Sequence, residues 1–300
     1  MSLWIPVTLA AAVFQTLRFM LQRQLSLKTL TATGATFARF LYSAPLVVVG
    51  ITLYLNSTGQ ARPTMGPEFW IYGALGGASQ VLATIAVVLL FKERNFAVGV
   101  TFKNTEAMQA ALVGLIVLGD SISLAGFGAI ALGVFGVLLL SVPPDSVRWR
   151  LADAANRAAG LGLAAGLLFA FSGVFYRGAS LALDLDDPLA RAGLTLAAVT
   201  SMQMIGMALW LSLREPRQIH AVVAAWRVAA LVGLLSMAGS FCWFTAFTLQ
   251  NAAYVKTVGQ VELILSLLAT TLVFRERIAR REWIGMGVLL ASVLVLIAVL

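Results

Sequence analysis

Cysteine and histidine are almost missing from this sequence of 300 residues, since each occurs once, as Cys242 and His220. A single cysteine excludes an intrachain disulfide and gives no thiol-based metal site. The sequence has no HExxH motif, and Cys242 has no histidine beside it in its apolar segment. Asp186 and Asp187 are adjacent carboxylates, but such a pair is more typical of a solvated turn than of an acid/base couple. We therefore expect no enzyme activity, no metal and no cofactor.

Charged residues are also scarce, at 11% of the sequence, whereas 60% of the residues are hydrophobic. Soluble domains contain roughly 25% charged residues, so this composition excludes an ordinary water-soluble domain. The chain divides into apolar stretches of about 18 to 25 residues, each long enough to cross a hydrocarbon core of about 30 Å. These stretches do not alternate with a period of two, which argues against a barrel. The sequence predicts an all-α integral membrane protein.

We predict ten transmembrane helices from these stretches. Their ranges are 3–20, 30–55, 69–91, 96–118, 124–142, 158–176, 189–211, 222–247, 252–274 and 283–300. The first is not expected to be a cleaved signal, because it lacks a basic n-region and Gln15 and Arg18 interrupt it. The chain is therefore predicted to be a multi-pass membrane protein, of the kind found in the bacterial inner membrane.

The net charge of +8 could indicate nucleic-acid binding, but the cations lie in short loops between the predicted spans. Thirteen lie in alternate loops and only Arg62 and Arg177 in the others. The thirteen are Arg23, Lys28, Lys92, Arg94, Arg148, Arg150, Arg157, Arg214, Arg217, Arg275, Arg277, Arg280 and Arg281. Short loops with excess cations remain in the cytoplasm, which places both termini on the outer side. We expect a lipid bilayer as the partner, and no nucleic acid.

An internal repeat relates the two halves of the chain. The stretch FKERNFAVGVTFKNTEA, Phe91 to Ala107, aligns without a gap with FTLQNAAYVKTVGQVEL, 156 residues later. We predict a five-helix repeat at 1–142, a cytoplasmic linker at 143–157 and a second five-helix repeat at 158–300. Because five is odd, the halves must enter the membrane in opposite directions, and equivalent loops should have opposite charge. The cationic KERN indeed aligns with the uncharged LQN, as expected of an inverted-topology repeat.

The stretch VGQVELILSLLATTLVFRERIARREWIGMGVLLASVLVLI, Val258 to Ile297, resembles the EamA-like branch of the drug/metabolite transporter superfamily. Its first-half counterpart, Thr105 to Ser141, fits the same pattern of a helix, a short acidic turn and a glycine-bearing last helix. The resemblance implies a substrate-specific carrier, and many such carriers export amino acids or related metabolites. Members of this family are usually drawn with both termini in the cytoplasm, the reverse of the orientation that the loop charges predict here.

Charged residues near the middle of the predicted spans are the candidate site. Glu106 and Glu262 lie about ten residues into their spans, and a midplane charge usually faces a cavity or a partner because its insertion is costly. Lys103 and Arg39 also lie deep, whereas Arg18, Arg191, Arg227 and Lys256 are close enough to span ends to reach the interface. Supporting polar residues are Asn104, Gln109, Gln260 and Lys256, which could equally form interhelical hydrogen bonds.

Two arrangements of these charges remain open from the sequence. Lys103 and Glu106 are three residues apart on one helix face and could neutralise each other. Alternatively, Lys103 or Gln260 could reach Glu262 across a helix interface. Glu262 and Lys256 lie about 120° apart around their helix, which makes Lys256 a poorer partner.

Paired acids and cations suit a small zwitterion such as an amino acid. Its carboxylate would meet Lys103 or Arg39, and its ammonium Glu106 or Glu262. They suit proton coupling equally, since a desolvated carboxyl has a raised pKa. We expect a secondary transporter that works by alternating access and exports a small-molecule solute, with a monomer compatible with this function. The alternative is a non-transporting membrane scaffold or a channel-like protein.

Overall fold

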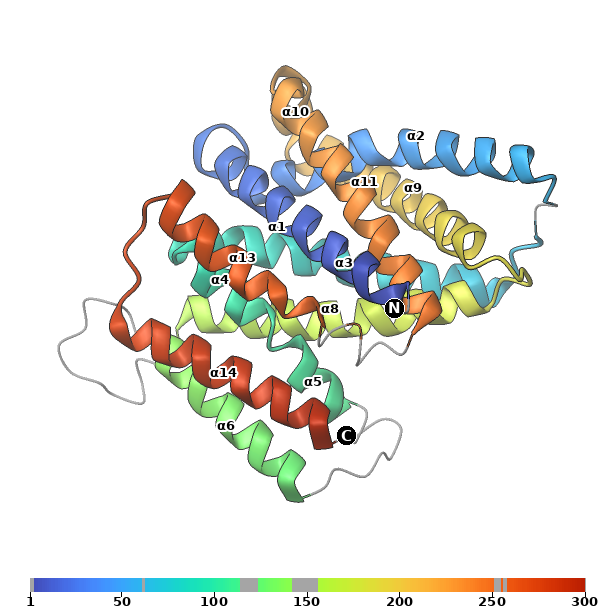
Figure 1. Ribbon diagram of the computed structural model, residues 1–300. Coiled ribbons are helices and arrows are strands. Elements are labelled where there is room, and N and C mark those ends of the chain that lie inside the picture. The colour runs from blue at the N-terminus through green and yellow to red at the C-terminus, as the bar shows by residue number, and fades with distance from the viewer. Residues whose placement is uncertain are drawn as a thin grey trace.

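The structure is a computed structural model that describes residues 3–60, 63–113, 124–141, 156–250, 255 and 258–299. These residues form helices and connecting turns, with no strand among them (Figure 1). The helices are α1 (Trp4–Lys28), α2 (Ala32–Thr58), α3 (Pro67–Glu93), α4 (Phe96–Lys103), α5 (Glu106–Val113), α6 (Leu124–Ser141), α8 (Arg157–Leu181), α9 (Pro188–Arg214), α10 (Pro216–Ala224), α11 (Trp226–Leu249), α13 (Val261–Leu268), the π-helical η2 (Ala269–Val273) and α14 (Arg280–Val299).

Six of the described helices are long and apolar enough to cross a membrane: α1, α2, α3, α8, α9 and α11. Shorter apolar helices cover Leu124–Leu140 and Val261–Val273. The predicted span 96–118 is divided into α4 and α5, and its last residues lie outside the described part. In the predicted span 252–274 the described residues Val255, Val258 and Gly259 are helical, Gln260 is a turn and α13 begins at Val261. Each of these two predicted helices is therefore interrupted by a turn, at Asn104 and Thr105 in the first and at Gln260 in the second.

The ends of the long helices follow from local capping. The side chain of Asn95 accepts a hydrogen bond from the N–H of Val98 at 2.9 Å, and that of Asn156 accepts one from Ala159 at 3.0 Å. The N–H groups of the first helical turn have no acceptor within the helix, and an asparagine at the N-cap supplies one. The predicted starts at 96 and 158 therefore agree with α4 and α8 to within a residue. The first predicted span is too short, because α1 continues to Lys28.

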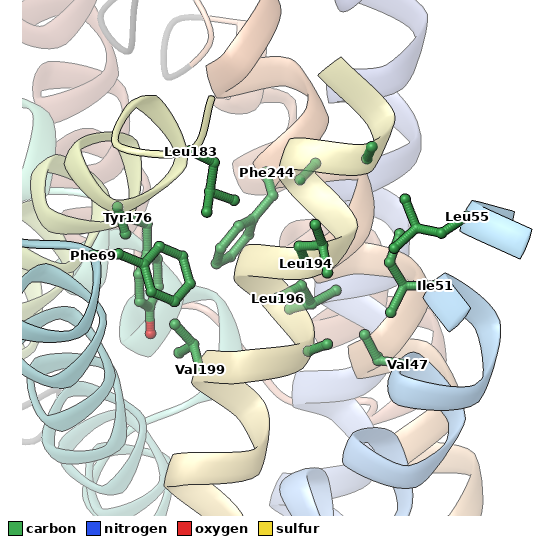
Figure 2. Close-up of a cluster of buried hydrophobic side chains, with 14 residues drawn as sticks. Val47, Ile51, Leu55, Phe69, Tyr176, Leu183, Leu194, Leu196, Val199 and Phe244 are labelled. Carbon is green, nitrogen blue, oxygen red and sulfur yellow. The ribbon is translucent and has the colours of Figure 1, made fainter. Parts of the chain in front are cut away.

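The two halves of the chain share one core. Figure 2 shows a buried cluster to which α2 contributes Val47 and α9 contributes Leu196 and Val199. In the same cluster the ring of Tyr176 on α8 lies 4.7 Å, between centroids, from that of Phe244 on α11. Burial of these apolar groups against one another holds helices from both halves in a single unit.

Helix packing follows a regular pattern between the halves. α1 packs along α11 and α3 along α8, while α2 packs on α9, and α4 on α13. α6 and α14 lie side by side as a separate pair (Figure 1), and the hydroxyl of Ser292 donates to the carbonyl of Ala129 at 2.6 Å. Most close contacts therefore join a helix of one half to a helix of the other.

Contacts also bring the cation-bearing loops together at one end of the molecule. Glu215 accepts a hydrogen bond from Thr31 at 2.8 Å, which joins the loop after α9 to the loop after α1. Ion pairs join the other basic loops to this end: Arg23 with Glu276, Arg94 with Glu282 at 2.8 Å, and Arg157 with Glu93 at 3.3 Å. At the opposite end Asp187 accepts from Tyr54 at 2.7 Å. We call the first end the basic end.

Candidate functional site

A break between α4 and α5 places two charged residues at helix ends. Lys103 is the last residue of α4, Asn104 and Thr105 form a turn, and Glu106 is the first residue of α5. The second half has a matching turn at Gln260, directly before α13. Gln260 is the equivalent of Asn104 at the repeat offset of 156 residues. Acids in a first helical turn and a lysine in a last turn complement the helix dipole. Both halves thus break their helix at equivalent positions, beside Glu106 and Glu262.

Lys103 and Glu262 form a buried ion pair between the two halves. The Lys103 Nζ lies 2.7 Å from the Glu262 Oε2, and their side chains are 4% and 2% exposed. The same oxygen accepts a hydrogen bond from the Nε2 of Gln15 on α1 at 3.0 Å. Gln15 in turn accepts from the indole N–H of Trp243 on α11 at 3.1 Å. Glu262 is therefore the centre of a network that joins α1, α4, α11 and α13.

The ion pair decides between the two arrangements that the sequence leaves open. Lys103, at the end of α4, reaches across the interface to Glu262, whereas Glu106 begins the next helix, α5. Its ammonium also lies 5.7 Å from the centroid of the Phe169 ring on α8, within the range of a cation–π interaction. Glu106 is buried as well, with 3% exposure, so both acids lie inside the protein.

Arg39 is buried on α2, at 2% exposure, and its described hydrogen-bond partners are all hydroxyl groups. The Nε donates to Ser236 at 2.6 Å, one Nη to Ser240 at 3.0 Å and the other to Thr84 at 3.3 Å. No carboxylate of the described residues forms a salt bridge with it. Arg39 therefore keeps its charge in the interior without a described counter-ion.

Arg18 corrects an expectation from the sequence. It was expected to reach the membrane interface, but it is buried at 2% exposure. Its Nη1 donates to the Oε1 of Gln22 at 3.2 Å, and Gln22 donates to the carbonyl of Ala35 at 3.0 Å. The reason is the length of α1, whose end at Lys28 leaves Arg18 deep within the helix rather than near its end.

The supporting polar residues have different positions. Asn104 and Gln260 are buried, at 3% and 7% exposure, in the two turns that interrupt the helices. Gln109 instead donates to the carbonyl of Leu163 at 3.1 Å, which is an interhelical hydrogen bond between α5 and α8. Lys256 lies outside the described residues.

A second polar network was not predicted from the sequence. Gln203 on α9 donates to Gln80 on α3 at 3.1 Å and to Tyr176 on α8 at 3.2 Å, and Tyr176 donates to Gln80 at 3.0 Å. Gln203 also lines a cleft of about 510 Å³ between α3 and α9. The signal available in the sequence was the presence of two glutamines within apolar spans, since buried amides need hydrogen-bond partners.

Glu276, in the loop after η2, and Glu282, in the first turn of α14, hold the first turn of α4. Glu276 accepts from the N–H of Phe96 at 3.3 Å and pairs with Arg23. Glu282 accepts from the side chain of Asn95 at 3.1 Å and pairs with Arg94. These contacts close the basic end between the two halves. Among the described residues, no cluster of three or more His, Cys, Asp or Glu side chains could hold a metal ion.

Residues 156–298 match the EamA-like transporter family. The match confirms the resemblance expected from the sequence, and it covers the half that contributes Glu262, Glu276 and Glu282. With the several apolar spans, it indicates a multi-pass membrane transporter of small solutes, a class that is generally not enzymatic.

Comparison with solved structures supports the fold over nearly the whole chain. Twenty-two solved chains match significantly. One, described as the crystal structure of a protein, is 15% identical, with a TM-score of 0.57. The match covers 95% of this chain and 97% of the other. No curated protein sequence gives a significant match.

Proposed function

We propose that this protein is a secondary carrier that moves a small organic solute across the membrane by alternating access, in the direction of export. In this proposal ten membrane-spanning segments form two inverted five-helix repeats, with α4–α5 and the segment ending in α13–η2 as the interrupted spans. The cell membrane of a bacterium is the proposed location. The solute is amino-acid-like, and a proton is the proposed coupling ion.

The observation that carries the proposal is the Lys103–Glu262 ion pair, because it joins the two halves where both have a helix break. In transporters built from inverted repeats, substrate and ion sites lie at the repeat interface and are formed by discontinuous helices. An ion pair at 2.7 Å in an apolar interior needs both partners, since the loss of one leaves an uncompensated charge. A solute or a proton that competes for either partner can therefore shift the contact between the halves.

The packing pattern supports an inverted repeat. Exchange of the two halves converts the α1–α11 contact into the α8–α3 contact, and it converts the α2–α9, α4–α13 and α6–α14 contacts into themselves. Such pairs are expected when two similar halves are related by a two-fold axis in the membrane plane. The ion pairs at the basic end then represent one closed gate of the cycle.

Protonation of Glu262 would remove the charge that holds Lys103, and the proton would be released when the pair forms again. This gives a direct route to coupling, because one carboxylate would be neutral in one step and paired in another. A zwitterionic solute would act on the same groups, with its ammonium at Glu262 and its carboxylate at a cation.

Solute counterflow in proteoliposomes tests the proposal. Vesicles preloaded with an unlabelled amino acid should accumulate the labelled form when the wild-type protein is present, and a scaffold would not support this exchange. Glu262→Gln should abolish proton-driven accumulation. Glu68→Gln is the matched control, because it removes an exposed acid from the first turn of α3 and should leave transport unchanged. Equal transport by wild type and Glu262→Gln, at equal expression and at every pH, would contradict the proposed role of the pair.

A further inference from the structure

Two buried arginines of the described residues lack a salt bridge, although they lie in the same interior as the Lys103–Glu262 pair. Arg23 and Glu282 have salt-bridge partners at the basic end, and Lys103 has Glu262. Arg18 and Arg39 are also buried, each at 2% exposure, yet neither forms a salt bridge with a described carboxylate. A buried charge without a counter-ion is costly, so two such arginines need a physical reason.

We infer that Arg18 and Arg39 form an anion-binding subsite, and that the solute of the proposed carrier binds there through a carboxylate or a comparable oxyanion. This inference rests on the proposed function only in identifying the bound anion as the transported solute. Anion binding itself can be measured without transport. It names Arg39, rather than Lys103, as the cation that receives the anionic group.

The geometry around Arg39 suits a ligand of this kind. A guanidinium has five N–H donors, and three of them are directed at the hydroxyls of Ser236, Ser240 and Thr84. Within the described residues, the other two donors therefore remain for a ligand oxygen. Arginine binds carboxylates in a bidentate manner, and it is less strongly hydrated than lysine, which favours its use in a buried anion site.

Two of the hydroxyl partners of Arg39 occupy equivalent positions in the internal repeat. At the offset of 156 residues, Thr84 on α3 corresponds to Ser240 on α11, because 84 + 156 gives 240. Both hydroxyl oxygens accept a hydrogen bond from the same guanidinium. The residue at the position equivalent to Arg39 is Thr195, so only the first half supplies the cation. The site therefore lies where α2 contacts α3 and α11, which are corresponding helices of the two halves, and α2 supplies the charge.

Arg18 lies close enough to Arg39 to add to the positive electrostatic potential around it. Its partner Gln22 donates to the carbonyl of Ala35, which is one helical turn from Arg39 on α2. Arg18 also interacts electrostatically with Arg39 and with Glu262. The two arginines repel each other in a low-dielectric interior, and an anion between them would relieve that repulsion. Arg18 further links this subsite to the Lys103–Glu262 pair.

The polar groups next to Arg39 are neutral. Thr84 donates to the carbonyl of Gln80 at 2.8 Å, and the side chain of Gln80 belongs to the network with Tyr176 and Gln203. Amides and hydroxyls can recognise the uncharged polar parts of an organic anion without demanding an ammonium group. The net preference expected of this region is thus for an anion over an amine.

Thermal unfolding of the detergent-purified full chain tests this inference. The probes are sodium benzoate, sodium succinate and sodium phosphate, compared with benzylammonium chloride and sodium chloride at matched ionic strength. At least one oxyanion should raise the unfolding midpoint in a saturable manner, because a ligand of the native state stabilises it by mass action. Arg39→Gln should weaken that binding roughly 10- to 100-fold, as the loss of a charged hydrogen bond does. Arg18→Gln should weaken it less.

The control is Arg214→Gln, which removes an exposed cation near the end of α9 and should keep the anion effect of the wild type. Arg39→Met separates a binding role from a structural one. Its unfolding midpoint without ligand should equal or exceed that of the wild type, since it removes an uncompensated charge, while the anion effect is lost. A lower midpoint without ligand would mean that Arg39 is structural.

Two results would overturn the inference: no saturable stabilisation of the wild type by any of the three oxyanions, or equal stabilisation of wild type and Arg39→Gln. Failure of the proposed function is distinguishable from both. Binding that depends on Arg39 without counterflow of the bound anion would retain the anion subsite and reject the carrier.

Discussion

Glu262 shows how one carboxylate can join both halves of a membrane protein. It pairs with Lys103 and accepts from Gln15, and Gln15 is held by Trp243. None of these contacts is local in sequence, so the residue stabilises the fold only when all four segments are in place. The cost of burying the carboxylate is offset by the ion pair and the hydrogen bond together.

A double-mutant cycle on Lys103→Met and Glu262→Gln should separate the pair from its surroundings. Each single change leaves one buried group without its partner and should lower the free energy of unfolding by about 3–5 kcal/mol. The double variant should be more stable than the Lys103→Met variant, because no uncompensated charge remains. Unfolding in a denaturing detergent series measures this. Additive losses in the double variant would contradict a direct interaction.

Asp187 gives a pH-dependent test outside the membrane-spanning segments. Burial raises the pKa of its carboxyl. Hydrogen bonds from Gln60, Tyr54 and the N–H groups of Leu189 and Ala190 together lower the pKa by more than burial raises it, so the pKa lies below its usual value. A lowered folded pKa stabilises the protein above the unfolded pKa, and this contribution is lost as the pH falls through the folded pKa.

Asp187→Asn should therefore be less stable than the wild type at pH 7, with a difference that begins to shrink near about pH 4 and disappears below the folded pKa. The effect should stay below about 1 kcal/mol because the group is largely solvated. Thermal midpoints of both proteins across this pH range provide the measurement. A difference that persists undiminished at the lowest pH would show that hydrogen-bond shape, not charge, matters at this position.

At the scale of elements, the sequence predicts the long helices better than the interrupted ones. The ranges of α2, α3, α8 and α9 follow from apolar runs between capping residues, and these signals are local. The break at Asn104 is not visible in this way, since neither proline nor glycine marks it. The turn depends on contacts with α8 and α13, which the sequence does not place.

The same limit applies to the candidate site. The depth of Glu106 and Glu262 could be predicted because each lies well inside an apolar run. The depth of Arg18 could not be predicted, because the polar residues in the last turns of α1 give no sign that the helix continues to Lys28. The partner of Lys103 was one of two alternatives, and only the packing of α4 on α13 decides between them.

Close packing of α8 on the break leads to a prediction for Gly166. A Cβ at this position would lie 3.1 Å from the backbone nitrogen of Glu106, so Gly166→Ala should push α5 away and reduce both stability and transport. Gly173→Ala on the same helix is the control, since a Cβ there meets nothing within 4 Å. It should be neutral or stabilise the helix by up to about 1 kcal/mol. Equal behaviour of the two variants would rule out this packing argument.

At the scale of the whole molecule, the closed basic end and the distribution of loop cations agree with a single orientation. Five loops that alternate along the chain meet at that end through Glu215, Glu276, Glu282 and the Arg157–Glu93 pair. Loops with excess cations are retained in the cytoplasm. The structure thus supports an alternating path of the chain. Cysteine labelling tests on which side of the membrane the basic end lies.

Cysteine labelling in a Cys242→Ala background should place Ser123→Cys outside and Arg280→Cys inside the cell. An impermeant maleimide added to intact cells should modify only the first, and both after permeabilisation. The reverse pattern would overturn the orientation inferred from loop charge. Modification of both from the same side would contradict the inverted repeat itself.

The contacts of α4 have a consequence for how such chains can be recombined. Its first turn is bound by Glu276 and Glu282 and the N–H of Ala97 by Thr270, while its last residue pairs with Glu262. All four partners lie between residues 262 and 282, in the other half of the chain. A chimera of two related carriers that took α4 from one parent and residues 262–282 from the other would inherit mismatched buried charges. These two segments, far apart in the sequence, are therefore expected to be exchanged together or not at all.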